Sequence, residues 1–446
     1  MGASGTRVTD PLRAQSRTAG GRFGGDWLST VIPRVFVLTN GLRLVTVKRP
    51  GTPTVAVRAY IRAGSRYDVE HRLHNKSGPA LGLAHLTEHL LFQGTRSHSQ
   101  RELFAQVEQF GGALDAGTTK EYATVGAVMP RQGLPTALAI LGEVLTEPAL
   151  READLRREKP IILEEIRRAG DGRGVIHDLF ARALWRQHPF RHPAHGTLEA
   201  LRDLEGAAVL AFHRQRYVAG NIALSVSGDV EREEVRRLVE AQFDSLPRGP
   251  EQPPIPTHER PPSQARTAHQ SKDIGQTLLL MGVSTVGMGH EDRGPLKVVE
   301  RVLGMGGSAR LYQRLREKEK LVYSVRTVTA HYEDVGFFAV QTACAPENKE
   351  AVRQAVEETW EELRQDGVNE DDLRAAKRNY AGTLARRFET NRALAGIFGI
   401  EVLLGQAEPF EEALRRINAV GGDDVVRAAQ TYLDPGRTVI VSVGRG

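Results

Sequence analysis

The stretch Leu246–Arg266 reads LPRGPEQPPIPTHERPPSQAR and carries seven prolines in 21 residues. Proline has no backbone N–H and a fixed φ, so this density excludes a helix interior or a central strand. The stretch therefore predicts an extended linker that divides the chain. We expect a flexible N-terminal extension over residues 1–34, a first domain over 35–245, the linker over 246–266 and a second domain over 267–446.

The two halves that the linker separates are similar to each other. Phe212–Val230 (FHRQRYVAGNIALSVSGDV) and Gln430–Gly444 (QTYLDPGRTVIVSVG) each place a tyrosine near a helix end, followed by a turn, an apolar strand and a glycine. Ala153–Leu155 and Asp371–Leu373 each open a long, arginine-rich helix. A repeated unit of about 200 residues predicts two homologous domains.

The expected strands and helices indicate the fold class. The Asn-Gly pair at residues 40–41 separates two apolar stretches, Val35–Leu38 and Leu42–Val47, which is the sequence signal of a β-hairpin. Helical stretches dominate from Pro79 onward. Further strands are expected at Val55–Ile61, Ile222–Ser227, Thr277–Thr285 and Thr438–Val443. This order predicts an α+β fold in which each domain is a mainly antiparallel sheet with helices packed on one face.

The composition is that of a globular protein. The 446-residue chain has a formal net charge of +5, and 40% of its residues are hydrophobic. Its apolar runs, such as Thr277–Met281, are far shorter than the roughly 20 residues that cross a bilayer. Basic residues alternate with acidic ones, as in Glu231–Arg237. We therefore expect neither a membrane nor a nucleic acid as a partner.

The cysteine content and the N-terminal sequence indicate the cellular compartment of the protein. Cys344 is the single cysteine, which excludes intramolecular disulfides, cysteine-ligated zinc and an iron–sulfur cluster. Met1–Asp26 is rich in Arg, Gly and Ser but lacks the apolar core of a secretory signal. These features predict a bacterial cytoplasmic protein with a disordered extension. An organellar matrix, reached through a transit peptide, is the alternative.

The sequence HLTEH at residues 85–89 is the motif that carries chemistry. His85 and His89 are four residues apart in an apolar, helix-like stretch, so they share a helix face and can hold one metal ion. Two imidazoles and a carboxylate suit zinc, with a fourth position left for water. Zinc lowers the pKa of such a water to about 7, and Glu88 can remove its proton. The order H-x-x-E-H is the inverzincin signature.

A second element, Arg157–Arg168 (REKPIILEEIRR), offers carboxylates for this metal. Glu158 and Glu165 are seven residues apart and share a helix face, whereas Glu164 points about a quarter-turn away. A third ligand and a supporting carboxylate could come from this stripe. Pro160, between the two glutamates, is expected to kink or begin the helix.

With these two motifs the chain resembles the pitrilysin/insulinase family of zinc metallopeptidases, which includes the mitochondrial processing peptidase and its bacterial relatives. The resemblance covers Val35–Gly446. It implies a zinc-dependent endopeptidase that hydrolyses peptides or leader segments inside an enclosed chamber, with Glu88 as general base. It implies Zn²⁺ ligands at His85, His89 and Glu165, a supporting carboxylate at Glu158, and Glu164 as the fallback ligand.

Two more stretches extend the resemblance. Gly111–Tyr122 (GGALDAGTTKEY) is similar to the family's edge strand, on which the substrate lies as an added strand. The implied substrate-binding residues are Ala113, Leu114, Asp115 and Ala116; the family often has Asn at the third of these. Gly304–Val325 is similar to the family's glycine turn and following helix. There the resemblance implies that Arg316 and Tyr323 orient the substrate and stabilise the oxyanion.

The repeat provides an internal comparison for the metal ligands. Lys297 lies opposite His85, and Glu300 and Arg301 lie opposite Glu88 and His89. Thr383 lies opposite Glu165. The second domain is therefore expected to lack zinc, so that one chain binds one metal ion.

The resemblance also implies a partner chain. In the family, a chamber consists of four homologous domains, so this chain would supply half of a clam-shell chamber. We expect a homodimer, with a heterodimer containing a zinc-less homologous subunit as the alternative. A non-catalytic scaffolding subunit of the same fold is the alternative function. The presence of both histidines and the glutamates favours catalysis.

Overall fold

The computed structural model describes residues 32–73, 78–171, 174–405 and 410–445. The predicted N-terminal extension lies outside these residues, except for its last three. The described chain forms two compact units. Unit 1 contains residues 32–166, 193–255 and 385–405, and unit 2 contains residues 167–192, 256–384 and 410–445.

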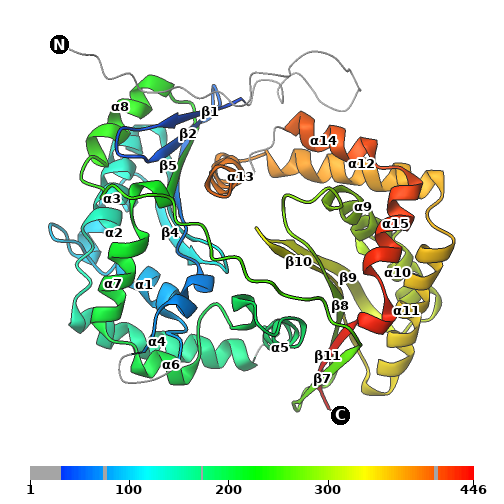
Figure 1. The fold of residues 1–446 in the computed structure, drawn as a ribbon. Coiled ribbons are helices and arrows are strands. Elements are labelled where there is room, and N and C mark those ends of the chain that lie inside the picture. The colour runs from blue at the N-terminus through cyan, green and yellow to red at the C-terminus, as the bar shows by residue number, and fades with distance from the viewer. Residues whose placement is uncertain (1–31, 74–77, 172–173, 406–409, 446) are drawn as a thin grey trace. The chain divides into compact units, whose positions relative to one another are not determined.

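Unit 1 contains a six-stranded sheet in the order β1-β2-β6-β3-β5-β4 (Figure 1). The expected hairpin around Asn40 is present as antiparallel strands β1 and β2. Only β2 and β6 run parallel among the paired strands of this sheet. The strands are β1 (Pro33–Val37), β2 (Arg43–Lys48), β3 (Thr54–Ile61), β4 (Ala113–Thr118), β5 (Ala123–Pro130) and β6 (Ile222–Gly228).

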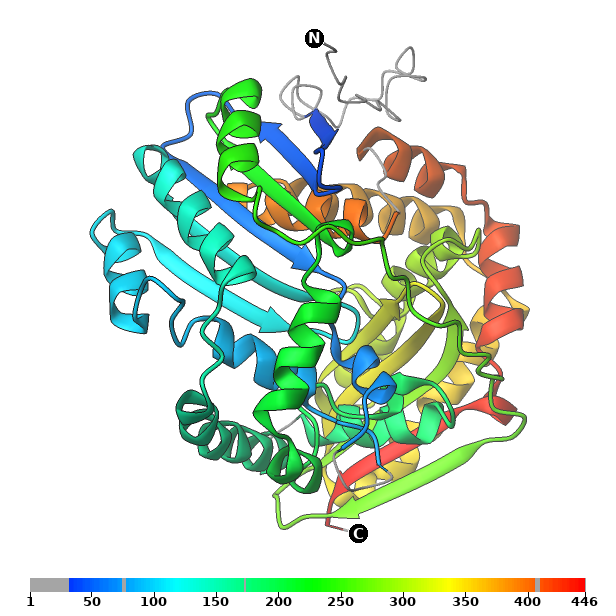
Figure 2. The same cartoon turned by 60° about the vertical axis from the view of Figure 1, so that its left-hand side comes forward.

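Helices cover one face of this sheet, and Figure 2 shows α3, α7 and α8 in front of the strands. Alternate residues of β3, such as Val55, Val57 and Ala59, point into the apolar core beneath these helices. The helices that contribute to this unit are α1 (Leu83–Leu91), α2 (Gln100–Glu108), α3 (Leu134–Thr146), α4 (Glu152–Asp171), α6 (Leu198–Asp203), α7 (Gly206–Arg216) and α8 (Arg232–Gln242).

The second face of the sheet is covered by α13 (Asn391–Leu403), which packs against β2, β3 and β6. Its close approach depends on Gly399. A Cβ atom at this position would lie 2.5 Å from a ring carbon of Tyr60 on β3, so a larger residue would push the helix off the sheet. The helix comes from the second half of the sequence, although it belongs to unit 1.

Unit 2 repeats the topology with a five-stranded sheet in the order β7-β11-β8-β10-β9. Here β7 and β11 are the parallel pair, and the remaining pairs are antiparallel. The order and the directions match β2-β6-β3-β5-β4 of unit 1, as the repeat predicts. The strands are β7 (Arg266–Ser271), β8 (Thr277–Val286), β9 (Val322–His331), β10 (Val335–Cys344) and β11 (Val439–Gly444).

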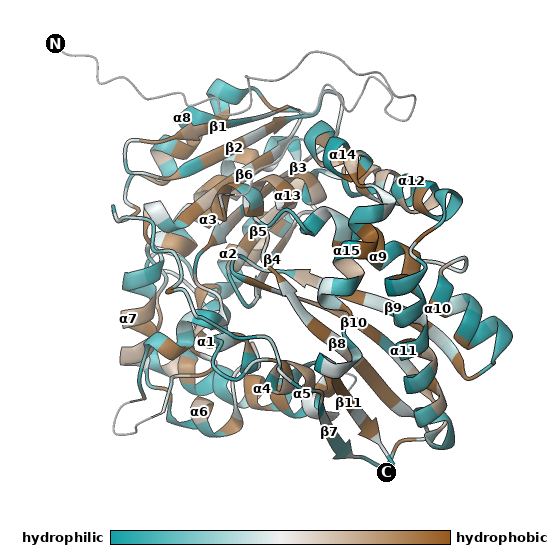
Figure 3. Ribbon diagram, turned by 45° about the vertical axis from the view of Figure 1, so that its right-hand side comes forward, coloured by the Kyte–Doolittle hydropathy of each residue, from teal (hydrophilic) through white to brown (hydrophobic). Residues whose placement is uncertain are grey.

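The helices of unit 2 also lie on both faces of their sheet. The larger layer, with mostly hydrophilic colouring along α12 in Figure 3, consists of α9 (Arg293–Gly304), α10 (Arg310–Tyr312), the π-helical turn η6 (Gln313–Lys318), α11 (Lys349–Gln365), α12 (Glu370–Arg387), α14 (Phe410–Ala419) and α15 (Gly422–Tyr432). The other face is covered by α5 (Val175–Leu184), which packs against β7, β8 and β11. This helix comes from the first half of the sequence.

The α+β class with two homologous, mainly antiparallel sheets is confirmed, with two differences in detail. Each sheet has a helix on its second face, where helices on one face only were expected. The units also differ from the contiguous ranges 35–245 and 267–446, because 167–192 lies in unit 2 and 385–405 in unit 1. Each sheet has a second face to bury, and the exchanged helices α13 and α5 pack on it.

The proline-rich stretch forms no helix or strand over residues 247–262. Its first part is hydrogen-bonded to unit 1, where Gln252 N–H donates to the Asn221 side chain at 2.7 Å. Its second part is hydrogen-bonded within unit 2, where the Glu259 carboxylate accepts backbone N–H groups of residues 186–188 at 2.7–2.9 Å. The segment therefore has no regular secondary structure and is held by specific hydrogen bonds in both of its parts.

Candidate metal centre

The N-terminus of α1 is held by a buried carboxylate. Asp68, in the short helix η2 (Ser65–Glu70), accepts backbone N–H bonds from Gly82 at 2.7 Å and from Ala84 at 2.9 Å. These donors have no partner within the helix, so Asp68 satisfies two of its free N–H groups. Burial raises the pKa of the Asp68 carboxyl to about 7, although both N–H donors act in the opposite direction. The cap fixes the start of the helix that carries HLTEH.

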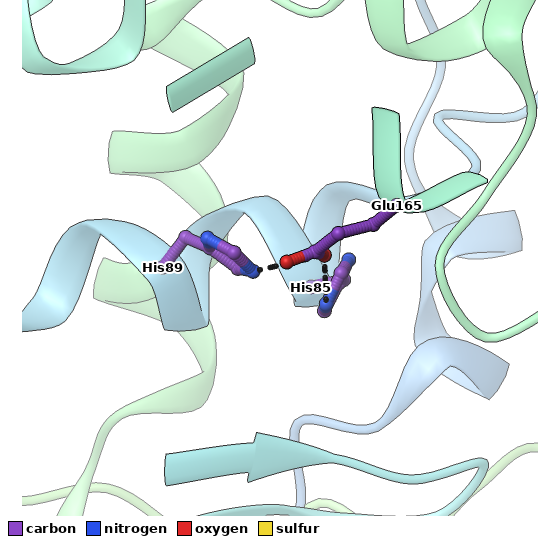
Figure 4. A group of neighbouring side chains, drawn as sticks. All are labelled: His85, His89 and Glu165. Carbon is purple, nitrogen blue, oxygen red and sulfur yellow. Dashed lines mark ion pairs between the residues drawn. The ribbon is translucent and has the colours of Figure 1, made fainter. Parts of the chain in front are cut away.

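His85 and His89 lie on one face of α1, with ring centroids 4.7 Å apart. The Glu165 side chain extends from α4 toward both rings, as Figure 4 shows. Its Oε2 atom lies 3.8 Å from His85 Nε2 and 3.5 Å from His89 Nε2. One ligand atom from each of these three residues falls within 4.8 Å of the others, and this is the group in the described chain that could hold a metal ion.

The donor atoms suit zinc, and two of their three separations are close to those of a tetrahedral site. Tetrahedral Zn²⁺ with Zn–N and Zn–O bonds of about 2.0–2.1 Å places its ligand atoms about 3.3–3.4 Å apart. The nitrogen–oxygen separations of 3.5 and 3.8 Å are within a few tenths of an ångström of that value. Burial, followed by the neighbouring His89, lowers the pKa of His85 to about 3. His85 is therefore neutral at physiological pH, which is the form that binds a metal ion.

Glu158 supports the second histidine. Its Oε2 atom lies 3.2 Å from His89 Nδ1, the nitrogen that faces away from Glu165. Pro160 lies inside α4, which runs on both sides of it, so it does not begin the helix. Glu158 and Glu165 therefore share a helix face as the spacing predicts, and Glu164 is outside the ligand group.

Glu88 lies beside the ligands without belonging to their group. It is half-buried, and burial is the main cause that raises the pKa of its carboxyl above the ordinary value. The Thr118 hydroxyl, at the end of β4, donates a hydrogen bond of 3.3 Å to Glu88 Oε2. The fully buried Tyr217 hydroxyl has no hydrogen-bond partner among the described residues. Burial and the nearby Glu88 charge both raise the pKa of Tyr217.

The predicted substrate-binding residues all lie on β4, which is the last strand at its edge of the sheet. Leu114 and Ala116 pack against the apolar core, so their side chains face the helical layer that contains α1. Asp115 points to the opposite face, where it forms ion pairs with Arg58 and Arg392. Ala113 is exposed. The strand therefore offers its backbone at the edge and a charged side chain on one face.

Arg316 and Tyr323 lie together in unit 2. The Arg316 guanidinium is 4.8 Å from the Tyr323 ring centroid and 5.0 Å from that of Tyr312, so it lies between two aromatic rings. Arg316 belongs to η6, and π-helical turns are frequent at functional sites. Tyr323 is the second residue of the edge strand β9 and is 77% exposed.

Unit 2 has an ion-pair cluster at the position that corresponds to the metal centre. Lys297 Nζ lies 3.2 Å from Glu300 Oε2 and 2.8 Å from Thr329 Oγ1, and Arg301 Nη1 lies 2.9 Å from the same Glu300 oxygen. Two fixed cations thus stand where unit 1 has two imidazoles. No zinc-like ligand group is found among the described residues of unit 2.

Asp68, Thr118, Tyr217 and Arg392 were not predicted as parts of a site. Asp68 lies 14 residues before Gly82, and Arg392 lies in the other half of the sequence. No local spacing connects such residues to the histidines or to the edge strand. Thr118 was inside the predicted edge strand, and alternation along that strand places it on the same face as Leu114 and Ala116. This alternation was the one sequence signal that could have placed Thr118 near the histidines.

Comparisons with known proteins show which sequences this chain resembles. Residues 43–198 match the model of the insulinase family, peptidase family M16, and residues 203–380 match the model of the peptidase M16 inactive domain. An uncharacterized zinc protease of Streptomyces coelicolor is 30% identical over 447 residues, which cover 98% of this chain and 94% of that protein. The uncharacterized zinc protease YmxG of Bacillus subtilis is 28% identical over 388 residues, covering 86% and 92%.

Solved structures share the fold. A protease from Helicobacter pylori has a TM-score of 0.85 at 23% identity and covers 92% of this chain and 99% of that one. A peptidase M16 inactive domain from Pseudomonas fluorescens has a TM-score of 0.84 at 22% identity, covering 93% and 98%. Among the described residues, no helix is long and apolar enough to span a membrane.

Proposed function

Because the chain belongs to the insulinase family, peptidase family M16, we propose that it is a zinc-dependent endopeptidase that hydrolyses peptides or leader segments. The observation that carries this proposal is the grouping of His85, His89 and Glu165 within 4.8 Å, next to a half-buried Glu88. Three protein ligands leave one position of a tetrahedral metal open for water, which is the arrangement of catalytic zinc sites.

The residues around the metal would have different roles in peptide hydrolysis. Zn²⁺ held by His85, His89 and Glu165 would lower the pKa of a bound water to about 7. Glu88 would take a proton from the water whose oxygen attacks the peptide carbonyl carbon, and would pass that proton to the leaving amine nitrogen. Burial raises the Glu88 pKa and makes this carboxylate a stronger proton acceptor. Thr118 would hold it in place.

The substrate would bind as an additional strand at the open edge of β4. Backbone hydrogen bonds to Ala113–Ala116 would hold peptides of many sequences. Arg316 and Tyr323 would donate hydrogen bonds to the peptide carbonyl, whose oxygen becomes negative during attack. Packing of Arg316 between two tyrosine rings supports this role, because it limits the motion of the guanidinium.

We place this activity in a homodimer in the bacterial cytoplasm. One chain carries both a zinc-site candidate and an Arg316/Tyr323 pair, so two copies would contain all the elements of two complete sites. The single Cys344 suits a reducing compartment. A heterodimer with a zinc-less homologue is the alternative assembly. The match to the inactive-domain model covers 203–380, which contains none of the ligand candidates, and so it does not favour a scaffolding role.

Peptide cleavage by the purified, zinc-loaded chain tests the function. A peptide library digested with and without a zinc chelator, and read by mass spectrometry, should show cleavage that the chelator abolishes and added zinc restores. Glu88→Gln should keep zinc and lose about 10²–10⁴-fold in turnover. Glu234→Gln, an exposed glutamate on α8, is the matched control. Cleavage at the wild-type rate by Glu88→Gln, or no cleavage of any peptide by the wild type, would refute the proposal.

A further inference from the structure

The charged side chains beside the edge strand β4 carry more positive than negative charge. Asp115 lies in the middle of β4, and its carboxylate contacts two guanidinium groups. Arg58 Nη1 lies 2.7 Å from Asp115 Oδ1, and Arg392 Nη2 lies 2.9 Å from Asp115 Oδ2. One carboxylate thus faces two cations, which remain protonated in proteins, so the cluster carries one excess positive charge.

The two arginines differ in their exposure to solvent and in the number of their side-chain partners. Arg58 is nearly buried and also donates to Tyr60 Oη at 3.1 Å and to Thr124 Oγ1 at 3.3 Å, so its guanidinium is fixed inside the sheet face. The Arg392 side chain is 60% exposed, and its contact with Asp115 is its one ion pair within the described part of the chain. Arg392 therefore has N–H donors that a ligand can reach.

The register of β4 indicates where this charge acts. Side chains of neighbouring strands that lie opposite each other share a face of the sheet, with Cβ atoms about 4.5–5.5 Å apart. A peptide added along β4 would therefore place one side chain beside Asp115, on the face that α13 covers. Its neighbours in the peptide would point to the other face, beside Leu114 and Ala116.

We propose that Asp115 and Arg392 make this enzyme select peptides with an aspartate or glutamate at the position opposite Asp115. This specificity rests on the proposed binding of peptides along β4. The acidic side chain would accept hydrogen bonds from Arg392 and share it with Asp115, and the excess positive charge would become neutral. A basic side chain at that position would meet two guanidinium groups and be disfavoured.

Substitutions of Arg392 and Asp115 are predicted to change the preference for acidic peptides in opposite directions. The assay compares pairs of peptides that are identical except for Glu or Gln at one position, chosen from the cleavage map of a library. For the wild type, kcat/KM should favour Glu by about two- to fivefold, because Arg392 is exposed and solvent screens its charge. Arg392→Gln should bring the ratio near one. Asp115→Asn leaves both arginines without a carboxylate and should raise the ratio above that of the wild type.

A purely structural role would not produce this pattern, because loss of either partner would then lower activity on both peptides alike. Arg237→Gln, an exposed arginine on α8, should leave the ratio unchanged. High salt should reduce the wild-type preference. Should Asp115→Asn impair folding, Arg392→Gln and Arg392→Glu still test the proposal, since the second should reverse the preference.

The failure of this inference is distinguishable from that of the proposed function. Binding of the same fluorescently labelled peptide pairs to the zinc-loaded Glu88→Gln chain gives a readout that needs no turnover. Cleavage with a Glu/Gln ratio of one would overturn the specificity alone. Preferential binding of the Glu peptide without cleavage by the wild type would support the specificity and refute the peptidase. Absence of both binding and cleavage for every peptide would overturn both.

Discussion

Glu158 Oε2 lies 3.2 Å from Nδ1 of His89, while Nε2 of the same ring faces Glu165 at 3.5 Å. The ring is thus held between two carboxylates seven residues apart on α4. A carboxylate on Nδ1 keeps the proton on that nitrogen and leaves Nε2 free to bind a metal ion. Glu158 is nearly buried, so this orientation is not subject to competition from bulk water.

Glu158→Gln should lower zinc affinity by about 10- to 100-fold without removing a ligand, because loss of such a supporting group weakens the ligand it orients. Competition titration with a fluorescent zinc chelator measures the change. Glu152→Gln, at the exposed start of the same helix, is the control. Equal affinities for both variants would show that Glu158 does not act on the metal through His89.

Glu165→Gln should reduce bound zinc to far below one ion per chain, whereas Glu164→Gln should leave it near one. The reason is geometric, because Glu165 lies between both imidazoles and Glu164 is outside the ligand group. Elemental analysis of the purified variants gives the metal content, and His85→Ala is the positive control for zinc loss. The reverse result would move the ligand by one residue along α4.

A mixture of two inactive variants should regain peptidase activity if sites are shared across a homodimer. One variant is Glu88→Gln, and the other combines Arg316→Ala with Tyr323→Phe. Neither should turn over alone, but a mixed dimer pairs one intact zinc site with one intact Arg/Tyr pair. Activity is measured after subunit exchange, with exchange followed by native mass spectrometry. Exchange without regained activity, or an active monomer in light scattering, would contradict sharing.

Acidification should destabilise the protein through His213. Burial lowers the pKa of this imidazole to about 4, below the ordinary 6.5 that it has in the unfolded chain. Between these values the unfolded state binds more protons than the folded state. The contribution of neutral His213 to the free energy of unfolding is therefore fully present above pH 6.5 and is lost as the pH falls toward 4. The whole contribution is about 3 kcal/mol.

Thermal unfolding of wild type and His213→Gln across this range measures the effect. The variant should lose less stability on acidification, since glutamine does not titrate. His258→Gln, at an exposed position, should keep the wild-type dependence. Parallel curves for wild type and His213→Gln would show that another group causes the acid sensitivity.

Much of the fold and of the metal centre follows from local sequence. The Asn-Gly pair at 40–41 specifies a tight turn, and β1 and β2 pair around it as expected. The spacing of His85 and His89 requires only that α1 be a helix, and the same holds for Glu158 and Glu165 on α4. Such periodicities depend on backbone geometry, which residues close in sequence determine.

Contacts between distant segments were decided by the tertiary structure alone. The exchange of α5 and α13, the Asp68 cap on α1 and the pairing of Asp115 with Arg392 join residues far apart in the chain. An amphipathic helix specifies that one face must be buried, but many apolar surfaces can bury it. Which surface does so is settled when all elements pack together, because close packing and the pairing of buried charges select one arrangement of the whole chain.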